Sequence, residues 1–146
     1  MTRTPSQTVG PFFHFSLCDR PASELSAGGT RLVGRVLDGA GKPVDDALVE
    51  LWHPDVGFGR CATDPDGRFE FVVTRPADGH LEVMVFARGL LKQVVTRVYF
   101  PDAEDDFLTS LGERDRSTLV AEEEDDGSLR FDIHLQGERE TVFFAV

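Results

Sequence analysis

Residues 34–55 read GRVLDGAGKPVDDALVELWHPD, and the expected fold class follows from the pattern of this stretch. Two short apolar-rich runs, GRVLD and ALVELWH, stand on either side of the turn-forming sequence DGAGKPVDD. Short runs of Val, Leu and Phe bounded by Gly, Pro and Asp are typical of β-strands, whereas amphipathic helices show a longer apolar period. The stretch therefore predicts two antiparallel strands joined by a turn.

The same pattern continues along the chain toward the C-terminus. FGRCAT and RFEFVVT are joined by DPDG, whose Asp-Gly pair is typical of hairpin turns, so we expect a second antiparallel pair there. LEVMVFA and QVVTRVYF follow, joined by RGLLK. SLRFDIHLQG shows the most regular alternation, with Leu129, Phe131, Ile133 and Leu135 on one face and polar residues on the other.

These runs predict an all-β fold, a β-sandwich of mainly antiparallel strands over residues 31–146. Residues 1–30 are expected to form an extended N-terminal arm and interface segment. The acidic connection at residues 102–121 has room for one or two helical turns, and EEEDDG at 122–127 is expected to be a charged surface turn.

Composition excludes several classes of partner. Fifteen Lys and Arg residues against 26 Asp and Glu give a net charge of −11, so a nucleic acid backbone or an anionic membrane would be repelled. No apolar run approaches the roughly 20 residues that span a bilayer, and no hydrophobic signal segment begins the chain, so we expect a cytoplasmic protein. Cys18 and Cys61 match no zinc or redox spacing and are expected to be buried thiols.

The four histidines, taken as residues alone, do not assemble a catalytic site. His134 lies between polar residues of its strand and is expected to face solvent, and His53 at a strand end is expected to take no direct part in chemistry. His80 and Glu82 are two apart on a strand and share a face, yet two ligands do not complete a metal site. No Ser-His-Asp order, phosphate-binding loop or dinucleotide fingerprint is present.

Five segments taken in order do resemble one family. They are similar to segments of the intradiol ring-cleavage dioxygenases, and they read TPSQTVGPFF, GRVLDGAGKPVDDALVELWHPD, FGRCATDPDGRFEF, VFARGLLKQVVTRVYFPD and RFDIHLQGERETVFF. The likeness runs over nearly the whole chain and is closest to the α subunits of that family. It implies a β-sandwich that pairs with a homologous β subunit, in which two tyrosinates and two histidines hold a non-haem Fe(III). The implied substrates are a small aromatic catechol and O₂.

The resemblance can be tested on the residues that would hold the iron. The chain has a single tyrosine, Tyr99, which falls where the family has a structural strand, so core or rim packing is expected for it. The catalytic His-x-His becomes His80 and Glu82, and Ala77 replaces the arginine that precedes the first histidine by three positions. We therefore expect no metal ligands and no catalytic residues in this chain alone.

Two loops are shorter here than in the α subunits that the chain resembles. The loops are short within two stretches of this chain, VELWHPDVGFGRC and VVTRPADGHLEV. Those subunits carry long segments at the same places. The contacts that such loops would make with a partner are therefore in doubt.

The resemblance also assigns pocket and interface roles. Gly10, Pro11 and Phe12 match a segment that walls the partner's active site, and Arg88 of the FARG motif matches an arginine that reaches the same pocket. Gly permits close backbone approach and Pro fixes the turn, which suits a rigid wall. Phe12 stands where relatives often have Tyr, so one hydroxyl is missing. The alternatives are a disordered terminus for the arm and a solvated hairpin charge for Arg88.

The expected function is that of a subunit that binds no iron itself and completes the active site of its β partner. The alternative from another class is a transthyretin-like β-sandwich binding module without catalysis, since a GRVLDGAGKPVDDALVEL strand followed by TDPDGRFEF is also typical of such modules. FARG and QGERETVFF favour the dioxygenase interpretation, because a bare module does not require them.

Overall fold

The computed structural model describes residues 3–8, 10, 13, 17–18 and 22–145 of the chain. Strands dominate this part, and the two helices that lie wholly within it have five residues each. The elements in chain order are β1 (Thr30–Leu37), β2 (Leu48–His53), β3 (Gly57–Ala62), β4 (Arg68–Val73), β5 (His80–Phe86), β6 (Val94–Tyr99), α2 (Asp106–Ser110), α3 (Glu113–Ser117), β7 (Glu122–Glu123), β8 (Leu129–Arg130) and β9 (Ile133–His134).

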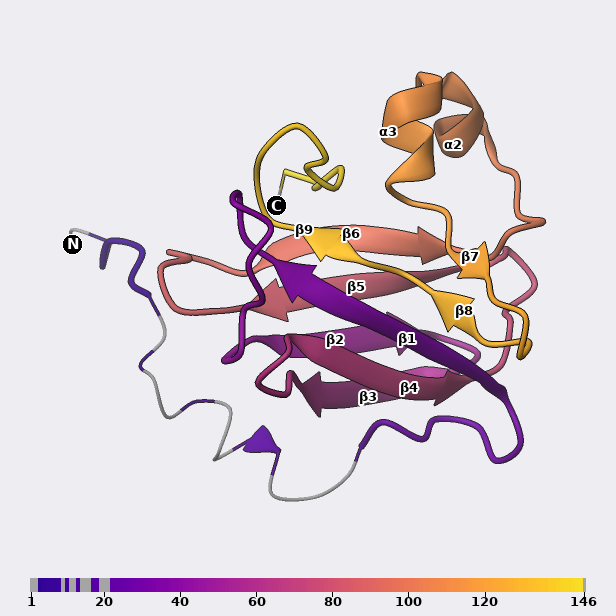
Figure 1. The fold of residues 1–146 in the computed structure, drawn as a ribbon, viewed down its shortest axis with the longest axis horizontal. Coiled ribbons are helices and arrows are strands. Elements are labelled where there is room, and N and C mark those ends of the chain that lie inside the picture. Colours follow the sequence, from indigo (N-terminus) through magenta and orange to yellow (C-terminus); the bar gives the residue numbers. More distant parts are fainter. Residues whose placement is uncertain (1–2, 9, 11–12, 14–16, 19–21, 146) are drawn as a thin grey trace.

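The strands form two sheets packed face to face (Figure 1). One sheet has the order β4-β1-β8-β7, with β9 also paired to β1, and the other has the order β3-β2-β5-β6. Neighbouring strands are antiparallel except where β8 and β9 run parallel to β1. The expected all-β sandwich is confirmed. The extension of the N-terminal arm stays a prediction, because several of its residues lie outside the described part.

The pairing of the first four strands differs from the sequence prediction. β1 pairs with β4, and β2 pairs with β3, so the two expected pairs β1–β2 and β3–β4 are wrong. The DPDG turn does form, with the Gly67 N–H donating to the Asp64 carbonyl at 2.8 Å. It carries the chain from one sheet to the other, as the segment before β2 also does. This crossing lets the apolar faces of both sheets cover each other.

The core lies between the two sheets and draws on both. Alternating residues of β1, β2, β4 and β5 point inward, as the two-residue period of a strand requires. The buried set that they form includes Leu32, Val36, Val49, Leu51, Phe69, Phe71, Leu81, Val83 and Val85. This core fixes the sheet that carries β5 and the turn that follows it.

The segment at residues 128–136 confirms its predicted buried face. Leu129, Phe131 and Ile133 are buried, and Leu135 is partly buried against the same core. The segment approaches β1 closely at Gly34, where an added Cβ would lie 1.9 Å from the Phe131 carbonyl oxygen. A side chain is therefore excluded at this position.

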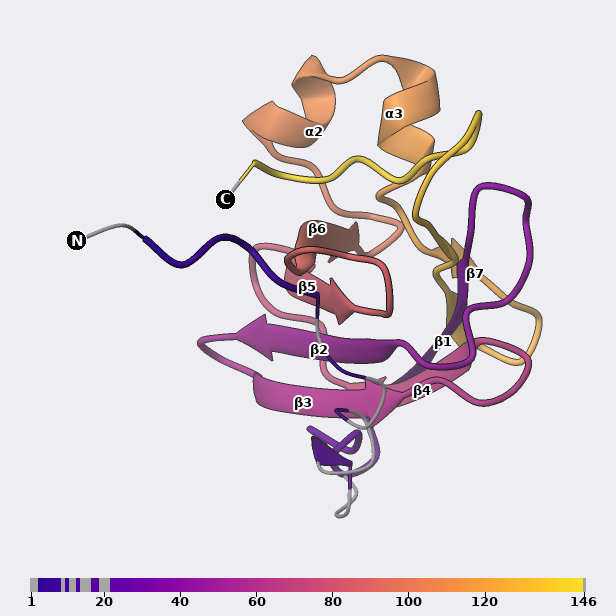
Figure 2. The ribbon, with the colours of Figure 1, turned by 90° about the vertical axis from the view of Figure 1, so that its left-hand side faces the viewer.

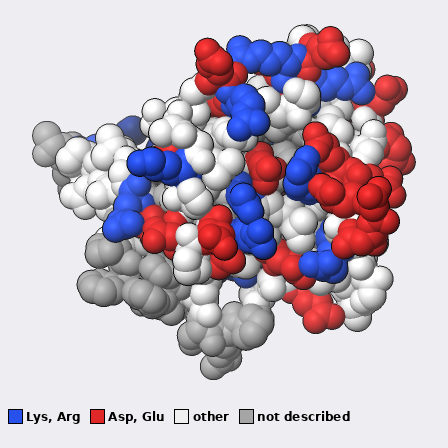
Figure 3. Space-filling view, viewed as in Figure 1, with Lys and Arg blue, Asp and Glu red and all other residues white. Residues whose placement is uncertain are grey.

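The acidic connection contains the two expected helical turns, α2 and α3, beside the end of the sandwich (Figure 2). Under them lies a second buried cluster of Tyr99, Ala103, Leu108 and Leu119. Acidic side chains gather over the neighbouring β7–β8 hairpin (Figure 3). Among the described residues, no helix combines the length and apolar character needed to cross a bilayer.

The two cysteines are less buried than expected. Cys18 and Cys61 are both half-buried, and no disulfide joins them. Burial is the main cause that raises the pKa of the Cys61 thiol above its usual value. Neither a bridge nor a reactive thiolate at Cys61 is indicated.

Candidate functional site

Arg88 lies in the turn that joins β5 to β6 and is held by two aspartates. Its Nε atom forms an ion pair with Asp46 Oδ2, and its Nη2 atom lies 3.5 Å from Asp45 Oδ1. The Asp46 side chain is 11% exposed, whereas the Arg88 side chain is 60% exposed. The guanidinium is therefore anchored along one edge and open to solvent along the rest.

The N-terminal arm meets this same turn. The Gly89 backbone N–H donates to the Thr8 hydroxyl at 3.3 Å, and Gln7 helps to line a 190 Å³ pocket with Leu90 and Leu91. Gly89 has φ of +86°, a conformation that favours glycine and brings its N–H toward the arm. Residues 7–8 and the Arg88 turn are thus neighbours in space.

Of the three expected arm residues, only Gly10 belongs to the described part. It is exposed, and an added Cβ would meet no atom within 4 Å. Pro11 and Phe12 lie outside the described residues. The wall that these three residues were expected to form stays a prediction.

The strand stretch that matches the family's iron ligands lies on the outer face of the β3-β2-β5-β6 sheet. His80 and Glu82 share that face, as expected, and Glu82 stands opposite Arg97 on β6 and Trp52 on β2. Among the described residues, no group of three or more His, Cys, Asp and Glu side chains is arranged to hold a metal ion.

Tyr99 does not have the environment of a metal ligand. The side chain is fully buried, and its ring packs against His80 with the centroids 5.1 Å apart. Its hydroxyl donates to Asp105 Oδ2 at 2.9 Å, while Arg97 Nη1 lies 3.4 Å away. Burial is the main cause that raises the pKa of Tyr99, with Asp105 adding to it, so the phenolate form is disfavoured. The expected core packing of Tyr99 is confirmed, and these residues do not fit a ferric site.

His53 is tied into a hydrogen-bonded group rather than presented to a ligand. The Asp55 backbone N–H donates to its Nδ1 at 3.1 Å, so in the neutral ring the proton lies on Nε2 and is donated to Asp78 Oδ2, also at 3.1 Å. Asp78 in turn lies 3.8 Å from Nδ1 of His80. This arrangement is consistent with the expectation that His53 takes no direct part in chemistry.

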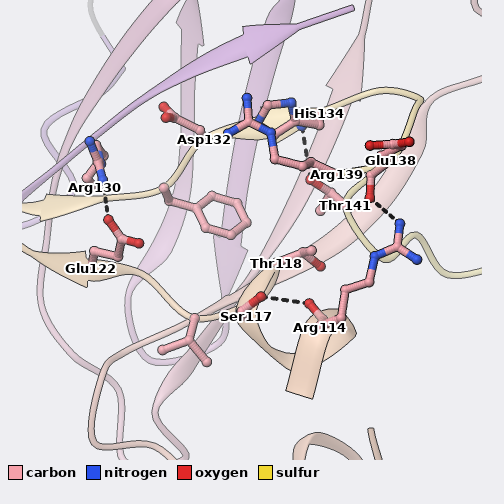
Figure 4. Close-up of a pocket in the computed structure, with 12 residues that line it drawn as sticks. Arg114, Ser117, Thr118, Glu122, Arg130, Asp132, His134, Glu138, Arg139 and Thr141 are labelled. Atoms are coloured by element: carbon pink, nitrogen blue, oxygen red, sulfur yellow. Dashed lines mark hydrogen bonds and ion pairs between the residues drawn. The ribbon is translucent and has the colours of Figure 1, made fainter. Parts of the chain in front are cut away.

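His134 is half-buried and lines a cavity of about 260 Å³, where it was expected to face solvent (Figure 4). The cavity lies between α3 and the segment that follows β9, and Arg114 closes one side through a hydrogen bond to the Glu138 carbonyl. Burial is the main cause that lowers the pKa of His134, and Arg139 lowers it further. Opposing charges of three arginines and three acidic residues line this cavity, so it favours no single class of ion.

The sequence analysis named Arg88 as a candidate site residue but did not name the aspartates that hold it. Asp45 and Asp46 precede β2 and read as turn residues, since paired aspartates after a Pro are common in turns. The signal that could have identified Asp46 is its place directly before the buried run ALVEL, where a carboxylate requires a partner.

No family model matches the chain. Two curated relatives match it over almost their whole length. The chain is 33% identical to the protocatechuate 3,4-dioxygenase alpha chain of Burkholderia cepacia, covering 100% of this chain and 98% of the relative. It is also 33% identical to the alpha chain of Pseudomonas putida, with 99% and 96% covered. The Burkholderia alignment extends over 194 positions against 146 residues here, so the relative has residues where this chain has none. The shortened loops agree with this difference.

A beta chain and several solved structures match more distantly. The beta chain of the Burkholderia cepacia enzyme is 28% identical over 66% of this chain and 55% of its own length. The dioxygenase domain of a carbohydrate-binding fusion from Streptomyces sp. SirexAA-E has a TM-score of 0.63 at 24% identity, covering 93% of this chain and 99% of that one. Hydroxyquinol 1,2-dioxygenase from Pseudomonas putida DLL-E4 has a TM-score of 0.58 at 22% identity, with 92% and 67% covered. Fold and sequence agree that this chain belongs to the intradiol dioxygenase family, together with the alpha chains of protocatechuate 3,4-dioxygenase.

Proposed function

We propose that this chain is the α subunit of a protocatechuate 3,4-dioxygenase. In complex with a homologous β subunit it would support the O₂-dependent cleavage of protocatechuate to 3-carboxy-cis,cis-muconate. The observation that carries the proposal is the match to alpha chains over the full length. The buried hydroxyl of Tyr99, which is bonded to Asp105, supports a role in which another chain supplies the phenolates.

The proposed cofactor is a non-haem Fe(III) held by the β subunit, which would activate the ring of the bound catechol for reaction with O₂. This chain would contribute the walls of the pocket. The Gly10 to Phe12 segment would exclude water, and Arg88 would offer N–H donors to the negative charge of the substrate. A guanidinium suits this task because it donates charge-assisted hydrogen bonds to a carboxylate in a fixed geometry.

Exposed apolar side chains support a protein partner. Among the described residues, large hydrophobic side chains at Leu17, Trp52, Phe58 and Leu91 are 42–63% exposed. Leu91 lies in the Arg88 turn, and Leu17 belongs to the N-terminal segment. Trp52 and Phe58 stand opposite each other on β2 and β3. The adjacent Trp52 and Phe58 side chains form an apolar patch of the kind that a partner subunit can cover.

Co-expression with the β-type chain of the same organism tests the proposal. We expect a stable complex of the two chains that contains iron and consumes O₂ with protocatechuate. The isolated chain should bind no stoichiometric iron and show none of the visible absorption of tyrosinate bound to Fe(III). A chain that stays monomeric and does not bind the β-type chain would contradict the proposal and favour the transthyretin-like binding module. One iron per isolated chain would also contradict it.

A further inference from the structure

A buried carboxylate lies behind the proposed pocket arginine. Asp46 is 8% exposed, and its Oδ2 atom is fully buried and has no hydrogen-bond partner among the described residues. In the described part of the chain, Arg88 is the residue that forms an ion pair with this carboxylate. A buried carboxylate without a cation is costly, because the charge loses its hydration and gains nothing in return. Burial of Asp46 therefore favours its ion pair with Arg88.

The same contact limits the orientations that the guanidinium can take. Arginine has five N–H donors in one plane, and an anchor at Nε fixes the direction of that plane. Asp45 adds a weaker contact at 3.5 Å from Nη2, and no hydrogen bond joins Nη1 to another described residue. The side chain is still 60% exposed, so its outer edge is free to bind an anion.

We propose that Asp46 is a positioning residue, which fixes Arg88 so that the free edge of its guanidinium faces the substrate carboxylate in the partner's pocket. This inference rests on the proposed function. An arginine on a flexible turn would lose side-chain entropy on binding the substrate, whereas an anchored one has already lost it in the free protein. The Thr8 contact with Gly89 holds the arm against the same turn, so arm and arginine would reach the pocket as one unit.

The test uses the complex of this chain with its β-type partner and the variant Asp46→Asn. The amide keeps the size of the carboxylate but removes its charge, so the fold should persist while the anchor weakens. We expect the Kd for protocatechuate, measured without O₂ from the visible spectrum of the iron, to rise about 5- to 20-fold. The Kd for 3,4-dihydroxybenzamide, which lacks the negative charge, should change less than about 2-fold. A purely structural role for Asp46 would weaken both ligands alike.

Three further variants separate this inference from the proposed function. Arg88→Ala should weaken protocatechuate binding at least as much as Asp46→Asn does. The double variant, which combines Asp46→Asn with Arg88→Ala, should bind protocatechuate no more weakly than Arg88→Ala alone. The double variant also covers the case in which Arg88→Ala fails to fold because Asp46 is left unpaired. Asp125→Asn, the matched control at an exposed carboxylate in the turn between β7 and β8, which has no contact with Arg88, should stay within about 2-fold of the wild type.

The outcomes are distinct. If the double variant binds protocatechuate as well as the wild type, Arg88 does not serve the pocket, and both its proposed pocket role and this inference are wrong. If the double variant is impaired but Asp46→Asn alone is not, the pocket role of Arg88 stands and the positioning role of Asp46 is wrong.

Discussion

Tyr99→Phe removes one hydroxyl from a buried hydrogen-bonded group and leaves the ring in place. The lost bond is the 2.9 Å contact from the hydroxyl to Asp105 Oδ2. The other oxygen of Asp105 accepts from the Leu108 N–H and caps α2, so this carboxylate joins the helix to the sheet. Hydrogen bonds to a charged group contribute about 1.5–3 kcal/mol, and partial exposure of Asp105 places this one at the lower end. We expect a loss of about 1.5–2 kcal/mol of unfolding free energy.

Urea unfolding followed by far-ultraviolet circular dichroism measures this loss, which corresponds to a fall in Tm of roughly 4–6 °C for a chain of this size. The matched control is a double-mutant cycle. In an Asp105→Ala background, Tyr99→Phe should cost less than about 0.5 kcal/mol, because its partner is gone. A loss below about 0.5 kcal/mol in the wild-type background would refute the view that this hydroxyl links α2 to the sheet.

Three other outcomes follow from buried groups. Tyr99 is the single tyrosine, so the ultraviolet absorption of tyrosinate reports its ionisation alone. We expect the folded protein to show a Tyr99 pKa above the ordinary value of 10.0. The neutral phenol should therefore contribute its full stability to the fold below pH 10.0, and this contribution should be lost as the pH rises through the higher folded-state pKa. An ordinary midpoint in the folded protein would contradict this. Arg139→Gln should raise the pKa of His134 in an NMR titration, since that guanidinium lowers it, and an unchanged pKa would show that the charge does not reach the ring. Gly34→Ala should lower the free energy of unfolding by about 3 kcal/mol or more, because the added Cβ would meet the Phe131 carbonyl oxygen. Gly112→Ala should lower it little, because no atom lies near the position of its Cβ. Equal losses in the two variants would contradict the close approach at Gly34.

Sequence periodicity was sufficient to identify the longer strands and their buried faces, because both are local properties. It missed β7, since Glu122–Glu123 begin the stretch that was expected to be a surface turn. The alternation in SLRFDIHLQG correctly predicts that Leu129, Phe131 and Ile133 are buried. It does not predict that this segment runs parallel to β1, since that pairing joins residues about a hundred positions apart. Likewise the Asp-Gly turn at residues 64–67 was recognised from its residues, while the sheet that each flanking strand joins depends on the whole core.

The candidate site was predictable only as far as the family likeness reaches. The resemblance identifies Arg88, but its anchor Asp46 is 42 positions away, and only the fold brings the two together. Conversely, His80 and Glu82 were correctly placed on one face by the two-residue period of a strand. What the sequence could not show was that Tyr99, the partner of His80 in the neighbouring strand, bonds to Asp105.

Two polar side chains near His80 are hydrogen-bonded within the chain itself, whereas the buried Nδ1 atom of His80 has no hydrogen-bond partner among the described residues. The Tyr99 hydroxyl bonds to Asp105, and His53 bonds to Asp78, so neither side chain can bind a ligand without breaking a part-buried hydrogen bond. Arg88 is different, because it is anchored by Asp46 at one edge and remains 60% exposed. A chain that bonds Tyr99 and His53 internally but presents an anchored cation suits the proposed role, in which it supports chemistry on another chain.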